Sequence, residues 1–308
     1  MDKIYDMIIV GGGPGGYTAA LYAARAGLDV LLVERLSAGG QMNLTGQIDN
    51  YPGFPEGVDG FQLSMNMQQQ AERFGAKTKY AEVLHLELEG SVKTVQTNEG
   101  SYLAKTVVVS TGANPRQLGV DRENEMIGRG VGYCAHCDGM FYRGKTVAVV
   151  GGGNSAVAEA MYLSRIAKEV ILIHRRDSLR ATQIYLKPLQ EASNIRFVWD
   201  SEVVELLGEE VLSGVKVKNL KNGEVEVLDV QGLFVSIGRK PATELVKEQL
   251  TLDHSGYIMA GENTRASVPG VYAVGDVRTK ELRQIVTAVA DGAMAVHMAE
   301  SYLRGGEA

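Results

Sequence analysis

The chain has 308 residues, of which 45% are hydrophobic and 22% charged, and its formal net charge is −6. This length exceeds what one hydrophobic core usually supports, so we expect two domains in an ordinary globular protein. The negative charge argues against a general affinity for nucleic acid or anionic membranes, because neither would attract it. The sequence has no signal-peptide pattern and no apolar stretch of the roughly 20 residues that span a bilayer, so we expect a cytoplasmic location.

Short β-branched runs alternate along the chain with longer helical stretches, which indicates parallel sheets flanked by helices. A strand–helix–strand unit occurs twice, with predicted elements at residues 7–10, 14–26 and 30–34 and again at 146–150, 154–166 and 169–174. The repeat predicts an α/β protein with two Rossmann-like domains.

Two segments rich in glycine and proline separate the second copy from the rest of the chain, and we call them the crossings. The predicted strand 102–110 leads into Gly112-Ala113-Asn114-Pro115, and the segment 235–237 leads into Gly238-Arg239-Lys240-Pro241. The C-terminal part carries a strand-like run at 270–277 and a helical run at 283–302. If this part rejoins the first domain, the second domain is an insertion bounded by two adjacent linkers.

The first glycine motif, Gly11-Gly12-Gly13-Pro14-Gly15-Gly16, stands between a predicted strand and a predicted helix. Glycines at these positions allow a tight turn and close approach of a pyrophosphate to the helix N-terminus. Glu34 ends the next strand, where a carboxylate can hold a ribose. This combination predicts an adenine-dinucleotide site.

The second motif, Gly151-Gly152-Gly153-Asn154-Ser155-Ala156, is followed by a strand that ends in His174-Arg175-Arg176, with Arg180 nearby. No carboxylate stands at the ribose position, and three guanidinium groups suit a 2′-phosphate. The motif therefore favours NADPH over NADH, although a solvated basic turn is the alternative reading of the arginines. Two dinucleotide sites predict a relay between two cofactors, with flavin the usual intermediary between a nicotinamide and a dithiol.

The only two cysteines stand as Cys134-Ala135-His136-Cys137. Two thiols this close in a reducing compartment suggest redox chemistry rather than a structural staple. A zinc site needs about four ligands, and the sequence offers no further cysteine. A redox function of the two cysteines is thus favoured over zinc binding and over buried, unreactive thiols.

Two neighbours of the cysteines are candidates for supporting roles. Asp138 could protonate a leaving thiolate, or it could cap a helix or form a turn with Gly139. His136 is either a spacer or a group that stabilises the neighbouring thiolate and makes the disulfide more oxidising.

Several motifs, taken in order, resemble those of low-molecular-weight bacterial thioredoxin reductases, over essentially the whole chain. They include GGGPGG at 11–16, CAHCDG at 134–139, GGGNSAVAEA at 151–160, HRRDSLRA at 174–181 and GVYAVGDV at 270–277. The resemblance implies a class II pyridine nucleotide-disulfide oxidoreductase and a homodimer. It also implies that Cys137 lies nearest the flavin, that Cys134 attacks a thioredoxin-type protein, and that Asp138 is the acid. Two departures are His136, where threonine is usual, and Tyr51, where tryptophan is frequent.

The resemblance and the motifs together give two sets of candidate cofactor residues. For FAD they are Gly11, Gly13, Pro14, Gly16, Glu34, Gly40, Gln41, Asn50, Gly112, Gly275, Asp276, Arg283 and Gln284. For NADPH they are Gly151, Gly153, Asn154, Ser155, Ala156, His174, Arg175, Arg176 and Arg180.

The predicted domains are a discontinuous FAD-binding domain, 1–113 and 242–308, and an inserted NADPH-binding domain, 114–241, that carries the cysteines. Because one inserted segment must present both the nicotinamide and the disulfide to one flavin, we expect it to swivel about linkers near Ala113 and Arg239. The expected reaction passes electrons from NADPH through FAD and the Cys134–Cys137 disulfide to oxidised thioredoxin. The alternative is a flavoprotein disulfide reductase that serves another thioredoxin-like or peroxiredoxin-system partner.

Overall fold

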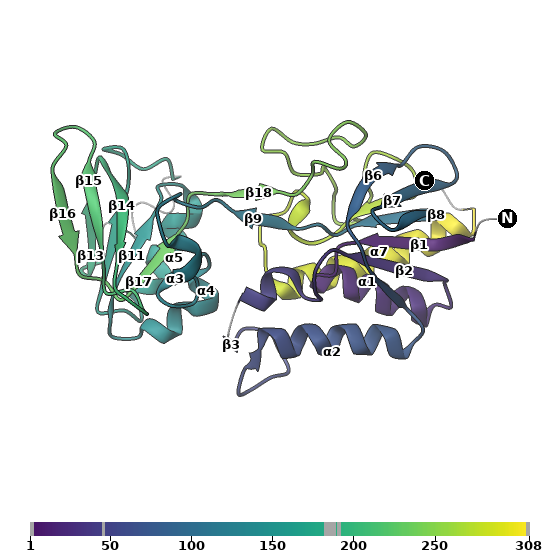
Figure 1. The fold of residues 1–308 in the computed structure, drawn as a ribbon, viewed down its shortest axis with the longest axis horizontal. Coiled ribbons are helices and arrows are strands. Elements are labelled where there is room, and N and C mark those ends of the chain that lie inside the picture. Colours follow the sequence, from purple (N-terminus) through teal and green to yellow (C-terminus); the bar gives the residue numbers. More distant parts are fainter. Residues whose placement is uncertain (1–2, 45–46, 182–188, 190–191, 306–308) are drawn as a thin grey trace. The chain divides into compact units, whose positions relative to one another are not determined.

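The computed structural model describes residues 3–44, 47–181, 189 and 192–305 (Figure 1). The chain divides into two compact units. Unit 1 comprises the described residues of Met1–Leu44, Tyr51–Asn114 and Lys240–Ala308, and unit 2 those of Thr45–Asn50 and Pro115–Arg239. Among the helices of the described ranges, none has both the length and the apolar character needed to cross a membrane.

Unit 1 is an α/β unit with one large sheet. Its strands are β1 (Ile4–Val10), β2 (Val30–Glu34), β4 (Val58–Asp59), β5 (Lys77–Tyr80), β6 (Val83–Glu87), β7 (Lys93–Thr97), β8 (Gly100–Val109) and β19 (Val271–Ala273). Its helices are α1 (Pro14–Arg25), α2 (Gly60–Arg73) and α7 (Ile285–Leu303), with short 3₁₀ helices η1 (Gly40–Leu44) and η3 (Gly275–Val277).

The sheet of unit 1 has the order β5-β2-β1-β8-β7-β6, with β19 also paired to β8. Strands β5, β2, β1, β8 and β19 are parallel, whereas β6, β7 and the start of β8 form an antiparallel meander. Strand β8 is therefore shared: residues 100–104 pair with β7, and residues 107–109 pair with β19. Through β19, the C-terminal part of the chain belongs to unit 1.

Both faces of this sheet are buried, which explains the nearly continuous apolar sequence of β1. Met7 and Ile9 pack with residues of α1, α2 and α7, and Figure 1 shows these helices along one face of the sheet. Ile8 and Val10 pack on the opposite face with residues of the meander and of the segment before β19. The glycine motif that follows β1 is thus attached to a strand fixed on both sides.

Unit 2 is a smaller α/β unit with two sheets. Its strands are β3 (Gln47–Ile48), β10 (Val131–Gly132), β11 (Thr146–Val150), β12 (Glu169–Ile173), β13 (Ile195–Val198), β14 (Ser201–Leu207), β15 (Gly214–Asn219), β16 (Val225–Leu228) and β17 (Gly232–Val235). Its helices are α3 (Glu123–Met126), α4 (Ala135–Asp138) and α5 (Asn154–Ser164), with the 3₁₀ helix η2 (Gly139–Tyr142).

The parallel sheet of unit 2 has the order β10-β17-β11-β12-β13. Val147 and Val149 of β11 pack with α5, while Ala148 and Val150 pack with the antiparallel sheet β14-β15-β16. The two parallel sheets confirm the predicted α/β class. Segment 47–50 groups with unit 2, whereas the sequence analysis assigned it to the FAD-binding domain.

The two crossings between the units form a short pair of strands, β9 (Ala113–Pro115) and β18 (Arg239–Pro241). The Ala242 N–H donates to Gly112 O at 3.0 Å, and the Arg116 N–H donates to Gly238 O at 3.0 Å. Each end of this strand pair is thus tied to its own unit.

Candidate functional site

The two glycine turns are built by the same hydrogen bonds, which identifies equivalent residues in the two units. In unit 1 the Gly11 N–H donates to Val33 O at 2.9 Å, and in unit 2 the Gly151 N–H donates to Ile173 O at 3.0 Å. The next residue after Val33 is Glu34, and the next after Ile173 is His174. His174 therefore occupies the position of the ribose-binding acid.

A serine closes each turn from the neighbouring strand. The Ser110 N–H donates to Val10 O and the Ser236 N–H to Val150 O, both at 2.8 Å. A side chain at Gly11 would collide with Ser110 O, and one at Gly151 would collide with Ser236 O. Neither serine is among the residues predicted from the sequence, although the pattern Ser-x-Gly-x-x-Pro, repeated at 110–115 and 236–241, is a signal for both.

The first glycine turn leaves open space where a pyrophosphate would approach. Gly11 has φ +105°, a conformation that L side chains rarely adopt, and a Cβ on Gly16 would collide with Gly11 O. Gly13 caps α1, and a Cβ there would meet no atom within 4 Å. Pro14 stands at the first position of α1, where its missing N–H costs nothing. The turn therefore fits an adenine dinucleotide at the N-terminus of α1.

Glu34 is oriented by the turn itself. Its Oε2 accepts a hydrogen bond from the Gly12 N–H at 2.7 Å, and its Oε1 accepts one from the Leu36 N–H at 3.0 Å. Both carboxylate oxygens are thus held beside the open end of α1. This geometry suits the predicted ribose contact, since each carboxylate oxygen has a second lone pair that can accept a further hydrogen bond.

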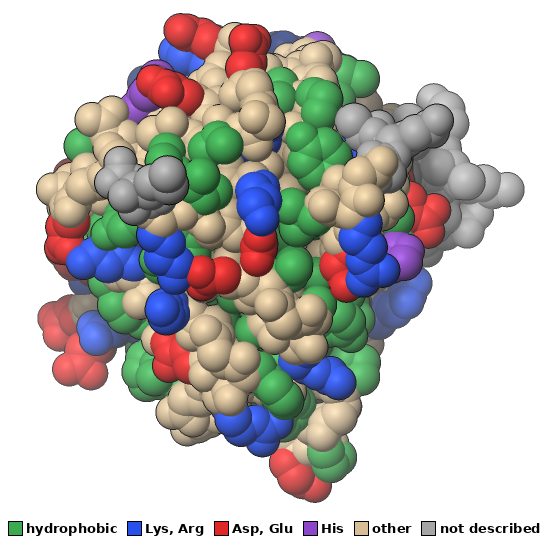
Figure 2. All heavy atoms as spheres, turned by 90° about the vertical axis from the view of Figure 1, so that its right-hand side faces the viewer, with side chains coloured by type: hydrophobic (Ala, Val, Ile, Leu, Met, Phe, Trp, Pro, Cys, Tyr) green, Lys and Arg blue, Asp and Glu red, His purple; other side chains and the backbone are tan. Residues whose placement is uncertain are grey.

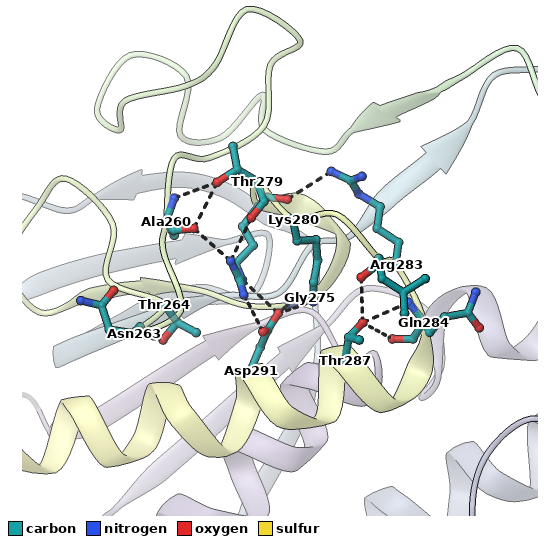
Figure 3. Close-up of polar contacts among 12 residues, drawn as sticks. Ala260, Asn263, Thr264, Gly275, Thr279, Lys280, Arg283, Gln284, Thr287 and Asp291 are labelled. Carbon is teal, nitrogen blue, oxygen red and sulfur yellow. Dashed lines mark hydrogen bonds and ion pairs between the residues drawn. The ribbon is translucent and has the colours of Figure 1, made fainter. Parts of the chain in front are cut away.

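The C-terminal candidates for FAD binding lie around η3 and the start of α7 (Figure 3). A Cβ on Gly15 of α1 would lie 3.6 Å from Gly275 N and 3.1 Å from Ala288 O, so η3 and α7 approach the first glycine turn closely. Gln284 begins α7 in a capping box, with its N–H donating to the Thr287 hydroxyl at 3.1 Å. The Arg283 guanidinium lies 4.1 Å from the centroid of the Tyr257 ring.

A buried ion-pair cluster fixes the η3 segment that carries Asp276. Asp291 of α7 accepts hydrogen bonds from the Gly275 N–H at 2.8 Å, from Arg278 at 2.8 Å and from Lys280 at 2.6 Å (Figure 3). Burial raises the pKa of the Asp291 carboxyl, but the hydrogen bonds from Arg278 and Lys280 outweigh it, and the net pKa is below the ordinary value. Asp291 was not predicted from the sequence.

The remaining FAD candidates have different placements. A Cβ on Gly40 of η1 would lie 3.8 Å from Gly13 Cα, so this residue lies beside the first turn. Gln41 Nε2 donates to Asn114 Oδ1 at 3.2 Å, and Gly112 has φ +73° at the start of the crossing. Asn50 groups with unit 2.

The second glycine turn, like the first, leaves open space at the N-terminus of the helix that follows it. Gly153 caps α5 with no atom within 4 Å of a Cβ, while Asn154 and Ser155 at the helix start are exposed. Ala156 is buried, and a Cβ on Gly151 would lie 2.7 Å from the Ala156 side chain. Position 151 therefore has to be glycine for Ala156 to fit beside it.

His174 and the three arginines form a positively charged edge next to this turn. His174 is only 4% exposed, its ring packs against Gly152, and its Nε2 has no hydrogen-bond partner among the described residues. Burial and the charges of Arg180, Arg175 and Arg176 lower the pKa of its imidazole. The three arginine side chains are exposed, and the Arg180 N–H is tied to Gly152 O at 2.7 Å. The set fits a phosphate group placed beside the second turn.

Cys134 and Cys137 form a disulfide across α4, with their Cα atoms 5.3 Å apart. The N–H groups of Cys137 and Asp138 both donate to Cys134 O at 3.1 Å, so Cys134 is the residue at which the short helix begins. Both cysteines are partly exposed. In the described part of the chain, no group of three His, Cys, Asp or Glu side chains could hold a metal ion.

Asp138 is largely shielded from solvent, and burial raises the pKa of its carboxyl to about 6. It makes no side-chain capping hydrogen bond to η2, which argues against the alternative role of a helix cap. His136 stacks on Tyr162 of α5 with ring centroids 4.5 Å apart, and burial lowers the pKa of its imidazole. His136 is therefore mainly neutral at pH 7.

A two-unit α/β chain with two equivalent glycine turns and a Cys-x-x-Cys disulfide is typical of the disulfide reductases that use a flavin and a pyridine nucleotide. Residues 5–292 match the family described as pyridine nucleotide-disulphide oxidoreductase, and the chain belongs to this family.

Its relatives within the family carry a more specific name. A thioredoxin reductase from Streptomyces coelicolor is 45% identical over 306 residues, covering 98% of this chain and 95% of the relative. A bifunctional thioredoxin reductase/thioredoxin from Mycobacterium leprae is 42% identical over 304 residues, 98% of this chain and 66% of the relative. The crystal structure of thioredoxin reductase from Streptococcus pyogenes matches with a TM-score of 0.92 at 44% identity, covering 99% of this chain and all of that one.

Proposed function

We propose that this chain is a thioredoxin reductase, an oxidoreductase that reduces the disulfide of a thioredoxin-type protein. The observation that carries the proposal is the Cys134–Cys137 disulfide in a chain that is similar over 98% of its length to proteins with this activity in their names. The relative that also carries the name thioredoxin supports a thioredoxin-type partner.

The proposed cofactors are FAD in unit 1 and NADPH in unit 2. When bound, FAD would carry two electrons from the nicotinamide to the disulfide. The open turn at Gly13, with Glu34 beside it, supports a dinucleotide in unit 1. In unit 2, His174 stands in place of that acid, and three arginines lie next to it. Both features support a 2′-phosphorylated nucleotide, and hence NADPH.

The chain's own residues have three proposed roles at the redox centre. Cys134 starts α4 and would attack the disulfide of the partner, whereas Cys137 would exchange electrons with the flavin. Asp138, with a pKa near 6, would hold a proton close to the sulfurs and supply it to a leaving thiolate. Reduction of the disulfide consumes two electrons and two protons, so a nearby proton donor is chemically required.

We further propose that unit 2 turns about the paired crossings β9 and β18 between half-reactions. Both the second dinucleotide turn and the cysteines belong to unit 2, so one flavin must meet them in succession. A cytoplasmic location and a homodimer complete the proposal, because thiols that cycle require a reducing compartment and the resemblance implies a dimer.

The test is anaerobic reduction of the purified yellow protein. NADPH should bleach the flavin absorbance at concentrations at which NADH does not, and oxidised thioredoxin should then restore it. A Cys134→Ser variant should still be bleached but should not be reoxidised by thioredoxin. Bleaching by NADPH with no response to any thioredoxin would favour the alternative of another thioredoxin-like or peroxiredoxin-system partner. Absence of flavin or of bleaching would overturn the proposal.

A further inference from the structure

Helix α5 carries an acidic residue, Glu159, that no part of the proposed reaction uses. It lies on the stretch of α5 that follows the second glycine turn. Gly139, directly after α4, also packs on α5, because a Cβ there would lie 2.9 Å from the Tyr162 ring and 3.1 Å from Leu163. Glu159 is therefore on the helix that supports the redox turn.

The contacts of Glu159 connect it directly to that turn. Its carboxylate accepts a hydrogen bond from the Ala135 N–H, the first N–H of α4, and interacts with the Ser236 side chain. Cys134 itself provides no side-chain cap for α4, so Glu159 satisfies a donor that the short helix would otherwise leave unpaired. Its other oxygen, Oε2, is buried without a hydrogen-bond partner among the described residues.

The charge of Glu159 is poorly compensated. Burial raises the pKa of its carboxyl to about 7, although the hydrogen bond from Ala135, the positive charge of Arg239 and the contact with Ser236 all act in the opposite direction. The other titratable side chains on α4, α5 and η2 include Asp138, Tyr142 and Tyr162, which carry no positive charge in any state, and His136, whose pKa is lowered by burial so that it is mainly neutral at pH 7. The protonation state of Glu159 is thus sensitive to a new charge nearby.

We propose that Glu159 is a positioning residue for the redox disulfide: its carboxylate holds the first turn of α4, and its negative charge opposes formation of the Cys134 thiolate. This inference rests on the proposed redox role of the two cysteines. Reduction breaks the S–S bond and adds two electrons and two protons, and a Cys134 thiolate forms when one of those protons leaves again. An ionised carboxylate held by the N–H of Ala135, the residue after Cys134, makes that loss less favourable.

The test compares Glu159→Gln with wild type in the reduced holoenzyme. Glutamine can still accept the Ala135 hydrogen bond, so the substitution removes the charge and keeps the position. The pH dependence of iodoacetamide alkylation reports the pKa of the Cys134 thiol, and Glu159→Gln should lower it by about one unit. Glu226→Gln, a change at an exposed glutamate of β16, is the matched control and should leave it unchanged.

Equilibration of the disulfide with dithiothreitol provides a second readout. At pH 8.5, Glu159→Gln should favour the reduced form by about tenfold, equivalent to about 30 mV for this two-electron couple. At pH 6 the wild-type carboxyl is protonated, so the two proteins should agree. Glu159→Asp keeps the charge and should retain the wild-type pH dependence, which keeps the test valid if the glutamine variant folds poorly.

Equal thiol pKa values and equal equilibria at both pH values would overturn the role of Glu159. Cysteines that form no dithiol with dithiothreitol or NADPH would instead overturn the proposed function. The two failures are therefore distinguishable.

Discussion

The acidic side chain next to the second cysteine has a protonation state tuned by its surroundings. Burial raises the pKa of Asp138 to about 6, so part of the protein population carries a proton on this carboxyl near neutral pH and can donate it. We expect Asp138→Asn to slow thioredoxin reduction by about 100-fold, because general acid catalysis typically contributes 10²–10⁴-fold. The pH–rate profile of wild type should fall above an apparent pKa near 6, and this limb should vanish in the variant. A normal rate with an unchanged profile would show that another group supplies the proton.

The raised pKa of the Asp138 carboxyl should also make the free energy of unfolding depend on pH. Its pKa in the folded protein lies above the ordinary value of 3.8, so the folded state binds more protons between pH 3.8 and about 6. The stabilisation is complete below pH 3.8 and is lost as the pH rises through 6. Denaturant titrations of Asp138→Asn should lack this slope.

His136 was expected to make the disulfide more oxidising. This stays a prediction, and burial, which lowers the pKa of the His136 imidazole, confines its positive charge to acidic pH. We expect His136→Thr to leave the redox equilibrium unchanged at pH 8 and to shift it toward the disulfide below pH 6. Redox titration at both pH values checks this, and a shift of equal size at both would mean that the ring acts through packing on Tyr162.

At the level of single residues, the sequence identified side chains that stand in motifs and missed those that act through packing. The cysteines, Glu34 and the arginines have fixed spacings from a glycine turn or from each other. Glu159 and Asp291 lie inside helices, where an acidic side chain ordinarily faces solvent. Only the fold shows that one meets α4 and the other η3.

Between elements, the two glycine turns are built alike but end in different residues, which supports the proposal that they hold two different nucleotides. Strand β2 ends at Glu34, whereas β12 ends at Ile173 and is followed by His174 and two arginines. We expect Arg176→Ala to raise the KM for NADPH by roughly ten- to 100-fold, since a hydrogen bond to a charged group contributes about 1.5–3 kcal/mol. Turnover with NADH should be unaffected.

The control for this change is Arg196→Ala in the same unit. Arg196 of β13 is exposed and pairs with Glu169 at 3.5 Å, away from the glycine turn. Its loss should leave both KM values unchanged. A similar increase for NADPH and NADH in Arg176→Ala would mean that this arginine does not contact a 2′-phosphate.

Helices α1 and α7 pack directly against each other. A Cβ on Gly292 of α7 would collide with Gly15 O and lie 2.9 Å from Ala19 N. Gly292→Ala should therefore lower the free energy of unfolding by about 1–3 kcal/mol and weaken flavin retention, because α7 also fixes η3. Gly261→Ala, where the nearest atom is 3.7 Å away, is the matched control. Equal thermal stability and flavin content in the two variants would contradict this account.

The alternation of strands and helices predicted the parallel sheets of both units, because β-branched runs and glycine turns are local signals. It did not predict the meander β6-β7-β8 or the antiparallel sheet β14-β15-β16, whose exposed faces give weaker patterns. The pairing of β19 with β8 joins residues more than 160 positions apart, which local patterns cannot specify.

For the molecule as a whole, the two crossings are the only covalent links between 115–239 and unit 1. Gly238 at the second crossing has φ +105°. Gly238→Val should therefore distort β18 and lower the turnover of thioredoxin, because we propose that unit 2 turns about this strand pair. Flavin content should remain normal.

Gly223→Val provides the comparison. Gly223 has φ +77° in the hairpin between β15 and β16, with open space around a Cβ. The same backbone strain at this position should reduce stability while turnover stays normal. If both variants lose turnover equally, the effect comes from general strain and not from the crossing.

On the face drawn in Figure 2, the charged side chains do not gather into a patch of one sign. Figure 2 shows Lys and Arg interspersed with Asp and Glu over the face that it presents, in keeping with a modest net charge of −6.

The place of β19 in the chain has a consequence for biosynthesis. A ribosome must deliver all of 115–239 before it delivers the strand that pairs with the end of β8 and the helix that packs on α1. Because domains generally fold as units while they emerge, the inserted half can mature first, and the half that encloses it stays incomplete until the last segment arrives. Capture of the prosthetic group by the outer half would thus be among the final events in the maturation of the enzyme.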